Sequence, residues 1–379
     1  MKKLILGLLV CAGGSLTQLH AQNITLPPSG DNQKSVVTQY MGPLASVTIT
    51  YHSPDVTSPS GEDRTGQIWG QLVPYGLNNF GFGSSTAAPW RAGANENTTI
   101  TFSHDVLVEG QPIEAGTYGL HMIAQESEPW TVIFSTKTTA WGSYFYDEKD
   151  DALRVQVQPQ EAEFHEWLTY EFTDRQPDQT TVALFWENKK VPFTIQVPNM
   201  TALYLDNMRN ELQSATGFSW QSWNAAANYA LTQDTLLEEA LTWAEAAVSA
   251  PFVGQENFTT LQTKAQLLEK LGKSEEAEAT IQQALNHPTT TPLQLHAYGR
   301  QLLSQGKKED AIEIFELNAE KHPDTWPVNV GLARGYSAAG SYKKALKYAK
   351  LAHEEAPDQL NKDNLQAAIE KLQNGEDIN

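Results

Sequence analysis

The stretch that decides the fold of half of this chain is "VGLARGYSAAGSYKKALKYAKLAHEEAP", residues 330–357. Its apolar and small residues follow a helical period, which Gly340 interrupts once. One glycine and one alanine of this stretch recur upstream at intervals of 34 residues: Gly272, Gly306 and Gly340, and Ala277, Ala311 and Ala345. These matched intervals predict repeated pairs of helices that bury their apolar faces against their neighbours.

This pattern resembles the tetratricopeptide repeat, a helix-turn-helix unit of about 34 residues. The quoted copy matches the motif at Leu332, Ala333, Tyr336, Ala345, Ala352 and Pro357. Two earlier copies match at Gly299, Ala311, Phe315 and Pro323, and at Ala265, Ala277, Ile281 and Ala284, with Pro288 one residue early. A divergent helix pair is expected from about Trp220 to Pro251. The resemblance implies an α-solenoid over residues 199–379 whose concave groove binds protein or peptide segments.

Before about residue 200 the sequence consists of short runs in which Val, Thr, Tyr, Phe and Trp alternate with polar residues. Such alternation predicts half-buried strands, and in "SVTITYH" it places Val47, Ile49 and Tyr51 on one face. Roughly eight strands are expected, in "SVTITYH", "TTITFSHDVLV", "TYGLHMIA", "WTVIFST", "ALRVQVQ", "EWLTYEF", "TVALFWE" and "VPFTIQV". Many short strands without helices between them predict an antiparallel β-sandwich or jelly roll over residues 22–198, with an open barrel as the alternative.

Several separated blocks of this half also resemble one family. They are, in order, "YHSP", "IWGQLVPYG", "WRAGANENTTITFS", "VEGQPIEAGTY", "WTVIF", "YDEKDDALRV", "EWLTYEF" and "KVPFTIQV". Together they are similar to the bacterial domain of unknown function 2911 over about residues 36–198. Shorter members pass almost directly from "LVPYG" to "WR", whereas residues 77–89 intervene here, which puts loop geometry near Arg91 in doubt. The family has no established activity, so the resemblance implies an architecture without a mechanism.

The N-terminus has the layout of a secretory signal peptide. In "MKKLILGLLVCAGGSLTQLHAQ" two lysines precede a short apolar core, and Ala21 offers a small-residue cleavage point. We expect residues 1–21 to be removed and the mature protein to be periplasmic or secreted. Lipid anchoring at Cys11 is the alternative, although Val10 is bulky for that signal. No later stretch is apolar enough to predict a transmembrane segment.

Composition excludes several kinds of chemistry. Cys11 is the only cysteine, so a mature chain without the leader has no disulfide, thiol nucleophile or thiolate metal site. The formal net charge of −19 argues against nucleic acid as a partner. Histidines are scattered without a metal-ligand spacing, and "DEKDD" (147–151) is best interpreted as a solvated acidic turn. We therefore expect no metal and no cofactor.

Polar chemistry is densest in "PWRAGANENTTITFS", residues 89–103. The candidate ligand-binding residues there are Trp90, Arg91, Asn95 and Glu96. Arg91 and Glu96 flank a turn, and we favour an ion pair between them that fixes the loop; the alternative is that both point into an opening beside Trp90. The strand that follows is expected to begin near Thr98, with Ile100 and Phe102 facing inward.

Tryptophans are frequent in this half and have two possible roles. Trp130, Trp167 and Trp186 lie in expected strands and are assigned to the core. Trp90 and Trp141 lie next to loops, where either core packing or stacking on a ligand ring is possible. Trp141 therefore joins the candidate ligand-binding residues.

The sequence as a whole favours an exported, non-catalytic binding or scaffold protein of the bacterial cell envelope. The helical groove would bind protein or peptide, and the β domain would bind an unknown small molecule or glycan. The alternative is an envelope hydrolase that acts on glycan or peptide through carboxylate and histidine residues of the β domain. A hollow with two acidic groups, or with a histidine–carboxylate pair, would favour the enzyme.

Overall fold

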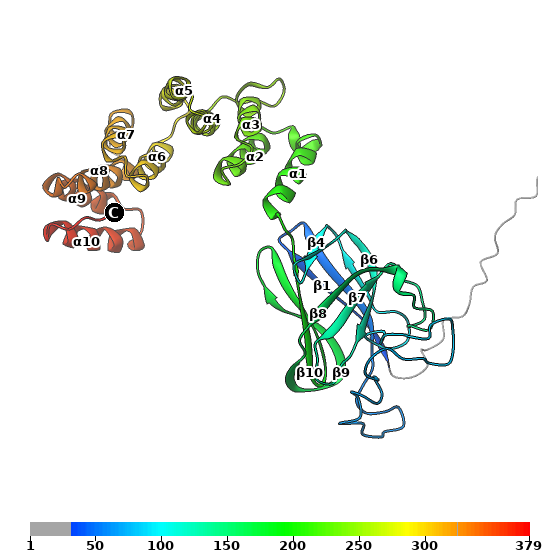
Figure 1. Cartoon of the computed structure of the whole chain (residues 1–379). Coiled ribbons are helices and arrows are strands. Elements are labelled where there is room, and N and C mark those ends of the chain that lie inside the picture. The colour runs from blue at the N-terminus through cyan, green and yellow to red at the C-terminus, as the bar shows by residue number, and fades with distance from the viewer. Residues whose placement is uncertain (1–31, 324) are drawn as a thin grey trace, which may run out of the picture. The chain divides into compact units, whose positions relative to one another are not determined.

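The computed structural model describes residues 32–323 and 325–379 (Figure 1). The expected leader, with Cys11 and the cleavage point after Ala21, lies outside the described residues. The chain divides into two compact units, the first ending at Met200 and the second running from Thr201 to Asn379. Strands build the first unit and helices the second, as expected.

Two antiparallel sheets form the β unit. Its strands are β1 (Gln33–Met41), β2 (Ala45–Ser53), β3 (Thr99–Phe102), β4 (Val106–Val108), β5 (Gln111–Ile113), β6 (Gly116–Ile123), β7 (Trp130–Ser135), β8 (Asp151–Val157), β9 (Gln160–Arg175) and β10 (Gln179–Gln196). Among the described residues, six strands form one sheet in the order β1-β2-β3-β6-β7-β8, and four form the other in the order β5-β4-β10-β9. This arrangement is a sandwich and not a closed barrel.

The core lies between the two sheets. Alternate residues of β2 are buried, and Val47, Ile49 and Tyr51 share the inner face as predicted. Rings from opposite sheets meet there: Tyr51 lies 4.9 Å from Tyr170, and Phe134 lies 6.0 Å from Phe193, between ring centroids. Such aromatic contacts add to the free energy gained by burying the strands' apolar faces.

The strand count differs from the expectation in four places, one of which is the short strand β5, which no expected strand covers. The segment "TTITFSHDVLV" forms two strands, β3 and β4, which belong to different sheets. The segments "TVALFWE" and "VPFTIQV" join in the single long strand β10. Strand β1, which was not predicted, pairs with β2 along its whole length. Period-two alternation reports which residues share a face, but it carries no information about which sheet a strand joins.

Two of the three tryptophans assigned to the core are buried there, and one assignment is wrong. Trp130 and Trp186 are each 1% exposed. Trp167 is 61% exposed, because its neighbours Leu168 and Tyr170 take the inner face of β9 and alternation turns Trp167 outward.

Ten α-helices lie within the described residues of the second unit: α1 (Met200–Leu212), α2 (Trp220–Thr232), α3 (Leu237–Ser249), α4 (Phe258–Lys270), α5 (Ser274–Asn286), α6 (Pro292–Ser304), α7 (Lys308–Lys321), α8 (Trp326–Ala338), α9 (Tyr342–Glu355) and α10 (Gln359–Gln373). The pairs α4–α5, α6–α7 and α8–α9 are the three predicted repeats. The pair α2–α3 confirms the divergent copy expected from Trp220 to Pro251. No helix in the described part of the chain has the length and apolarity that crossing a membrane requires.

The repeated glycines end the first helix of each repeat. Gly272, Gly306 and Gly340 follow α4, α6 and α8 with φ of 74°, 78° and 72°, the left-handed conformation that glycine adopts without strain. The repeated alanines of α5, α7 and α9 are buried where helices touch. The sequence interval therefore reflects one backbone geometry used three times.

Candidate functional site

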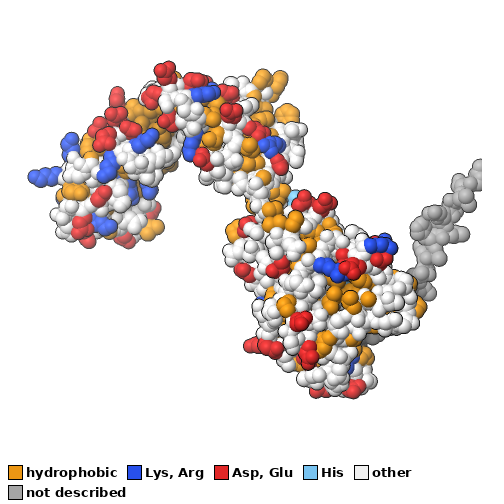
Figure 2. All heavy atoms as spheres, in the orientation of Figure 1, with side chains coloured by type: hydrophobic (Ala, Val, Ile, Leu, Met, Phe, Trp, Pro, Cys, Tyr) orange, Lys and Arg blue, Asp and Glu red, His pale blue; other side chains and the backbone are white. Residues whose placement is uncertain are grey.

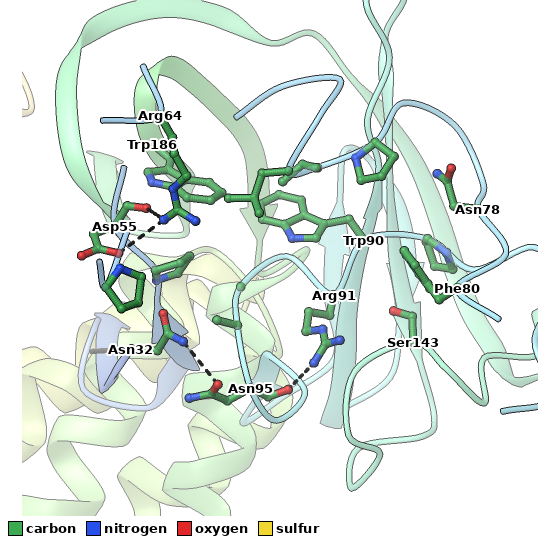
Figure 3. Close-up of a pocket in the computed structure, with 18 residues that line it drawn as sticks. Asn32, Asp55, Arg64, Asn78, Phe80, Trp90, Arg91, Asn95, Ser143 and Trp186 are labelled. Carbon is green, nitrogen blue, oxygen red and sulfur yellow. Dashed lines mark hydrogen bonds and ion pairs between the residues drawn. The ribbon is translucent and has the colours of Figure 1, made fainter. Parts of the chain in front are cut away.

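A hollow of about 380 Å³ opens at one end of the β-sandwich (Figure 3). Its lining residues are Asn32, Pro54, Asp55, Pro59, Arg64, Leu72, Val73, Pro74, Asn78, Phe80, Pro89, Trp90, Arg91, Gly93, Ala94, Asn95, Ser143 and Trp186. Fifteen of these eighteen residues, from Pro54 to Asn95, belong to the long connection between β2 and β3. Loops thus supply nearly all of the lining, and Trp186 of β10 is its one strand residue.

Arg91 lies at the centre of this lining. Its Nη1 donates a hydrogen bond of 2.6 Å to the backbone carbonyl of Asn95, and its guanidinium carbon lies 5.3 Å from the centroid of the Tyr144 ring. Figure 3 shows the guanidinium between the Asn95 loop and Ser143. One of the five guanidinium donors is used in this bond, which leaves others for a ligand.

The Arg91 loop is held in a strained conformation. Ala92 and Asn95 have φ of 52° and 55°, which is uncommon for residues other than glycine. Two hydroxyls fix the carbonyl of Ala92, from Thr98 at 3.0 Å and from Tyr170 at 2.9 Å. Residues held in such conformations cluster at functional sites, so the strain marks this loop as a candidate site.

The predicted ion pair between Arg91 and Glu96 is not formed. The carboxylate of Glu96 instead lies 3.2 Å from Nε2 of His52, and the Glu96 side chain is 56% exposed. Glu96 does not line the hollow. The Asn95 carbonyl lies closer along the chain and takes the guanidinium of Arg91, because the left-handed turn at Asn95 aims that carbonyl inward.

Asparagine amides and one ion pair complete the polar lining. Asn32 donates a hydrogen bond of 3.3 Å to the side-chain oxygen of Asn95. Arg64 lies 3.6 Å from the Asp55 carboxylate and also donates to the backbone carbonyls of Asp55 and Val56, at 2.8 and 3.0 Å. Asp55 is the only carboxylate among the lining residues of this hollow, and Arg64 already balances its charge.

Indole rings form the inner wall. Trp90 and Trp186 stack with centroids 6.1 Å apart, and Trp69 contacts both edge-on from behind. Trp186 belongs to a stretch of β10 where the register with β9 shifts next to Glu187, whose φ is 52°. β-Bulges often redirect a side chain beside a site, and this one places Trp186 at the hollow.

Aromatic rings cluster beside the hollow, where residues 77–89 meet the segment 141–146, and Phe80 is the one of them that lines it. Phe80 and Phe82 contact the Tyr144 ring edge-on at 5.9 and 5.4 Å, and Phe82 contacts Phe145 at 5.9 Å. Their exposed fractions are 43% for Phe80, 65% for Phe82 and 56% for Phe145. Trp141, which precedes Tyr144 and Phe145 in the chain, is 57% exposed but does not line the hollow.

A serine–histidine contact lies behind the hollow. Ser143 lines it, and its Oγ is hydrogen-bonded at 3.0 Å to Nδ1 of His121, which is 2% exposed. Burial, helped by the positive charge of Arg91, lowers the pKa of His121 from 6.5 to about 4. The imidazole is therefore neutral at pH 7, and a neutral imidazole can accept a proton.

A second hollow of about 300 Å³ lies on the other side of His121. Asn97, Lys137 and Tyr146 are among its lining residues, and the buried side-chain oxygen of Asn97 has no hydrogen-bond partner among the residues that the structure describes. Tyr146 in turn donates to Asp151 at 2.7 Å and accepts from Arg154 at 2.7 Å. This network fixes the loop that carries Ser143.

The structure brings together three of the five sequence candidates. Trp90, Arg91 and Asn95 line the hollow, whereas Glu96 and Trp141 do not. Sequence reasoning missed Asp55, Arg64, Asn32 and the Ser143–His121 contact. Nothing in the local sequence marks these residues, because each reaches the site from a separate segment.

Acidic charge does not gather into a further site. Red acidic side chains are spread over both units on the face seen in Figure 2, in keeping with the net charge of −19. Within the described part of the chain, no group of three or more His, Cys, Asp or Glu side chains is placed to hold a metal ion.

Comparison with known proteins found one family match and several similar solved structures. Residues 32–195 match the family described as protein of unknown function DUF2911. Solved structures similar to the chain include YrrB, described as a tetratricopeptide repeat protein with an unusual peptide-binding site (20% identity, 45% of this chain and 84% of that one, TM-score 0.28). Others are a tetratricopeptide repeat protein from Parabacteroides merdae (18%, 47% and 74%, TM-score 0.30) and MamA from Desulfovibrio magneticus (14%, 41% and 93%, TM-score 0.27). No curated protein matches the chain.

Proposed function

We propose that this chain is an exported, non-catalytic binding protein of the bacterial cell envelope. Its β domain binds a glycan or a similar ring-containing polar ligand at the hollow beside Arg91, and its helical repeats bind a protein or peptide segment. One observation carries the proposal for the β domain: the hollow offers the Trp90 indole, amides and a partly free guanidinium, and its one carboxylate is already paired.

The chemistry of the lining supports a glycan ligand. Sugar rings present C–H groups that pack on aromatic faces and hydroxyls that pair with amides and guanidinium groups. Trp90 and Phe80 supply the rings, while Asn95 and Arg91 supply the polar partners. Glycoside hydrolysis, in contrast, usually needs two carboxylates across the ligand, and the hollow has one.

A binding assay with two matched variants tests this proposal. Insoluble peptidoglycan is incubated with residues 22–379, and the bound fraction is measured after sedimentation. Arg91→Ala should reduce binding by about tenfold, since a charged hydrogen-bond donor is lost. Glu96→Gln, a change in the same loop but outside the hollow, should leave binding unchanged. Equal binding by both variants, or no binding by the unchanged chain to this or other envelope polysaccharides, would contradict the proposal.

Export rests on the composition of residues 1–21 and has its own test. Expression of the full chain in a Gram-negative bacterium should place the protein in the periplasmic or extracellular fraction. N-terminal sequencing should then begin at Gln22. Cys11→Ala separates the two kinds of export, because it blocks lipid anchoring and leaves simple cleavage intact. Retention of the leader in the cytoplasmic fraction would refute export.

Hydrolysis is the second candidate, favoured by the contact between Ser143 and His121. In a serine hydrolase the hydroxyl attacks an acyl carbon while the histidine accepts its proton, and the leaving group then takes that proton. Ser143 lines the hollow with neutral His121 behind it. The histidine–carboxylate pair His52–Glu96 does not line the hollow. A fluorophosphonate probe that labels the chain, but not its Ser143→Ala variant, would support hydrolysis; no labelling would exclude this nucleophile.

A further inference from the structure

Residues that follow α10 pack back onto α8. Gly375 ends α10 with φ of 78°, which lets the chain reverse direction. The hydroxyl of Ser337 then donates a hydrogen bond of 2.7 Å to the Asp377 carboxylate and accepts one of 3.1 Å from the backbone N–H of Ile378. The Ile378 side chain joins the apolar cluster that contains Ala333. We call residues 377–379 the return segment.

Arg334 contacts the backbone of the same segment. Its Nη1 donates a hydrogen bond of 3.4 Å to the backbone carbonyl of Ile378. Its own backbone carbonyl accepts a hydrogen bond of 3.1 Å from the side chain of Asn379. Helix α8 therefore contacts one carboxylate, one aliphatic side chain and the main chain between them. Such a combination of backbone and side-chain contacts is how a protein surface binds an extended peptide.

A second arginine lies one repeat earlier. Arg300 and Arg334 occupy the same position of α6 and α8, 34 residues apart. Arg300 is exposed, and among the described residues it has no ion pair. Burial and the charge of Arg300 lower the pKa of Arg334, while Asp377 opposes this effect. Burial and both arginines also lower the pKa of His296, to about 4. Two arginines from successive repeats thus act on the same surroundings in a strongly acidic chain.

We propose that α6 and α8 form a binding site for an acidic peptide segment in which an aliphatic residue follows the acid, and that the return segment fills part of this site in the free protein. The proposal deepens the peptide-binding function proposed for the repeats and rests on it. The return segment supplies the pattern of the ligand, Asp377 followed by Ile378. Arg300 remains free for a further carboxylate, so a partner with two acids would bind better than the return segment does.

The test uses a fluorescent peptide of residues 374–379, "NGEDIN", and measures its anisotropy with two proteins. A chain that ends at Gly375 should bind the peptide at least about tenfold more tightly than the chain with the return segment in place, because an intramolecular segment competes at high effective concentration. Binding of equal strength by both proteins would overturn the competition.

Variants assign the contacts. In the chain that ends at Gly375, Arg300→Ala should weaken binding of an acidic peptide by about tenfold. Lys343→Ala removes an exposed positive charge on α9 and should leave binding unchanged. The same peptide with Asp377→Asn should bind more weakly than "NGEDIN". Equal binding of the two peptides would overturn the assignment of the carboxylate to Ser337.

Truncation removes contacts that the return segment makes with α8, so a full-length variant provides an independent measurement. Asp377→Asn in the intact chain keeps the length and weakens the hold of the return segment, and it should increase binding of labelled "NGEDIN". A truncated chain with a normal helical circular dichroism spectrum that fails to bind the peptide would overturn the inference. A partner protein that binds the unchanged repeats and the Arg300→Ala variant equally well would leave the general peptide-binding function standing. It would contradict the assignment of that function to this site.

Discussion

Nδ1 of His121 lies 3.0 Å from Oγ of Ser143, and the pair is buried between the two hollows of the β domain. The positive charge of Arg91 acts on the imidazole from the side of the larger hollow. Ser143 and Arg91 both line that hollow. The protonation state of one buried histidine is thus linked to the site where we expect a ligand.

Stability of the β domain should fall as the pH is lowered through this linkage. The pKa of His121 is about 4 in the folded chain and 6.5 in the unfolded one, so the unfolded chain takes up the proton first. The contribution of neutral His121 to the free energy of unfolding is fully present above pH 6.5. It is lost between pH 6.5 and 4, at up to about 1.4 kcal/mol per pH unit and about 3 kcal/mol in all. Urea titrations of residues 22–200 at several pH values measure it. A His121→Gln variant should show a shallower pH dependence; an unchanged slope would mean that other groups cause it.

Arg91→Ala should destabilise the β domain by about 1–3 kcal/mol, because a charged hydrogen bond to the Asn95 carbonyl and a cation–π contact with Tyr144 are lost. Glu96→Gln is the control in the same loop and should stay within about 0.5 kcal/mol. The variant should also raise the pKa of His121, which an NMR titration follows. A loss below about 0.5 kcal/mol for Arg91→Ala would show that this arginine does not hold the loop.

The two units should fold independently. The contacts of the chain group into one unit that ends at Met200 and another that begins at Thr201. Residues 22–200 should give a β-type circular dichroism spectrum and a cooperative thermal transition, and residues 201–379 a helical spectrum and a separate transition. An aggregated or disordered β fragment would indicate that it needs the helices for its core.

Ala345→Leu should lower the stability of the helical unit by about 1–3 kcal/mol, since Ala345 is fully buried against neighbouring helices and a larger side chain overpacks them. Ala279→Leu makes the same change at an exposed position of α5 and should have little effect. Differential scanning calorimetry of residues 201–379 compares the two. Similar melting temperatures for both variants would show that the helix contact at Ala345 is loose.

Gly299→Ala should also be destabilising, because the added methyl group would collide with the Phe315 ring that packs on α6. We expect a cost of about 1–3 kcal/mol. Phe315→Leu removes part of that ring, so the cost of Gly299→Ala should be smaller in the Phe315→Leu background. A double-mutant cycle measured by urea unfolding gives the coupling free energy between the two positions. Additive effects of the two substitutions would show that these residues are not in contact.

The sequence alone determined the helical half in detail. The interval of Gly272, Gly306 and Gly340 predicted three helix pairs, and the helices of the structure begin at the same interval. In the β half the sequence also determined which residues face inward, such as Ile100 and Phe102. These features depend on contacts between neighbours in the chain, and such contacts leave a period in the sequence.

Only the tertiary structure decided the rest of the β domain. It separated β3 from β4, turned Trp167 outward, gave Arg91 the Asn95 carbonyl as its partner, and paired His121 with Ser143. A strand carries the same alternation in either sheet, and a polar side chain carries no mark of which distant group it will meet. These choices follow from how the two sheets pack and how the long loops close over them, because the free energy of those contacts is shared among residues far apart in the chain.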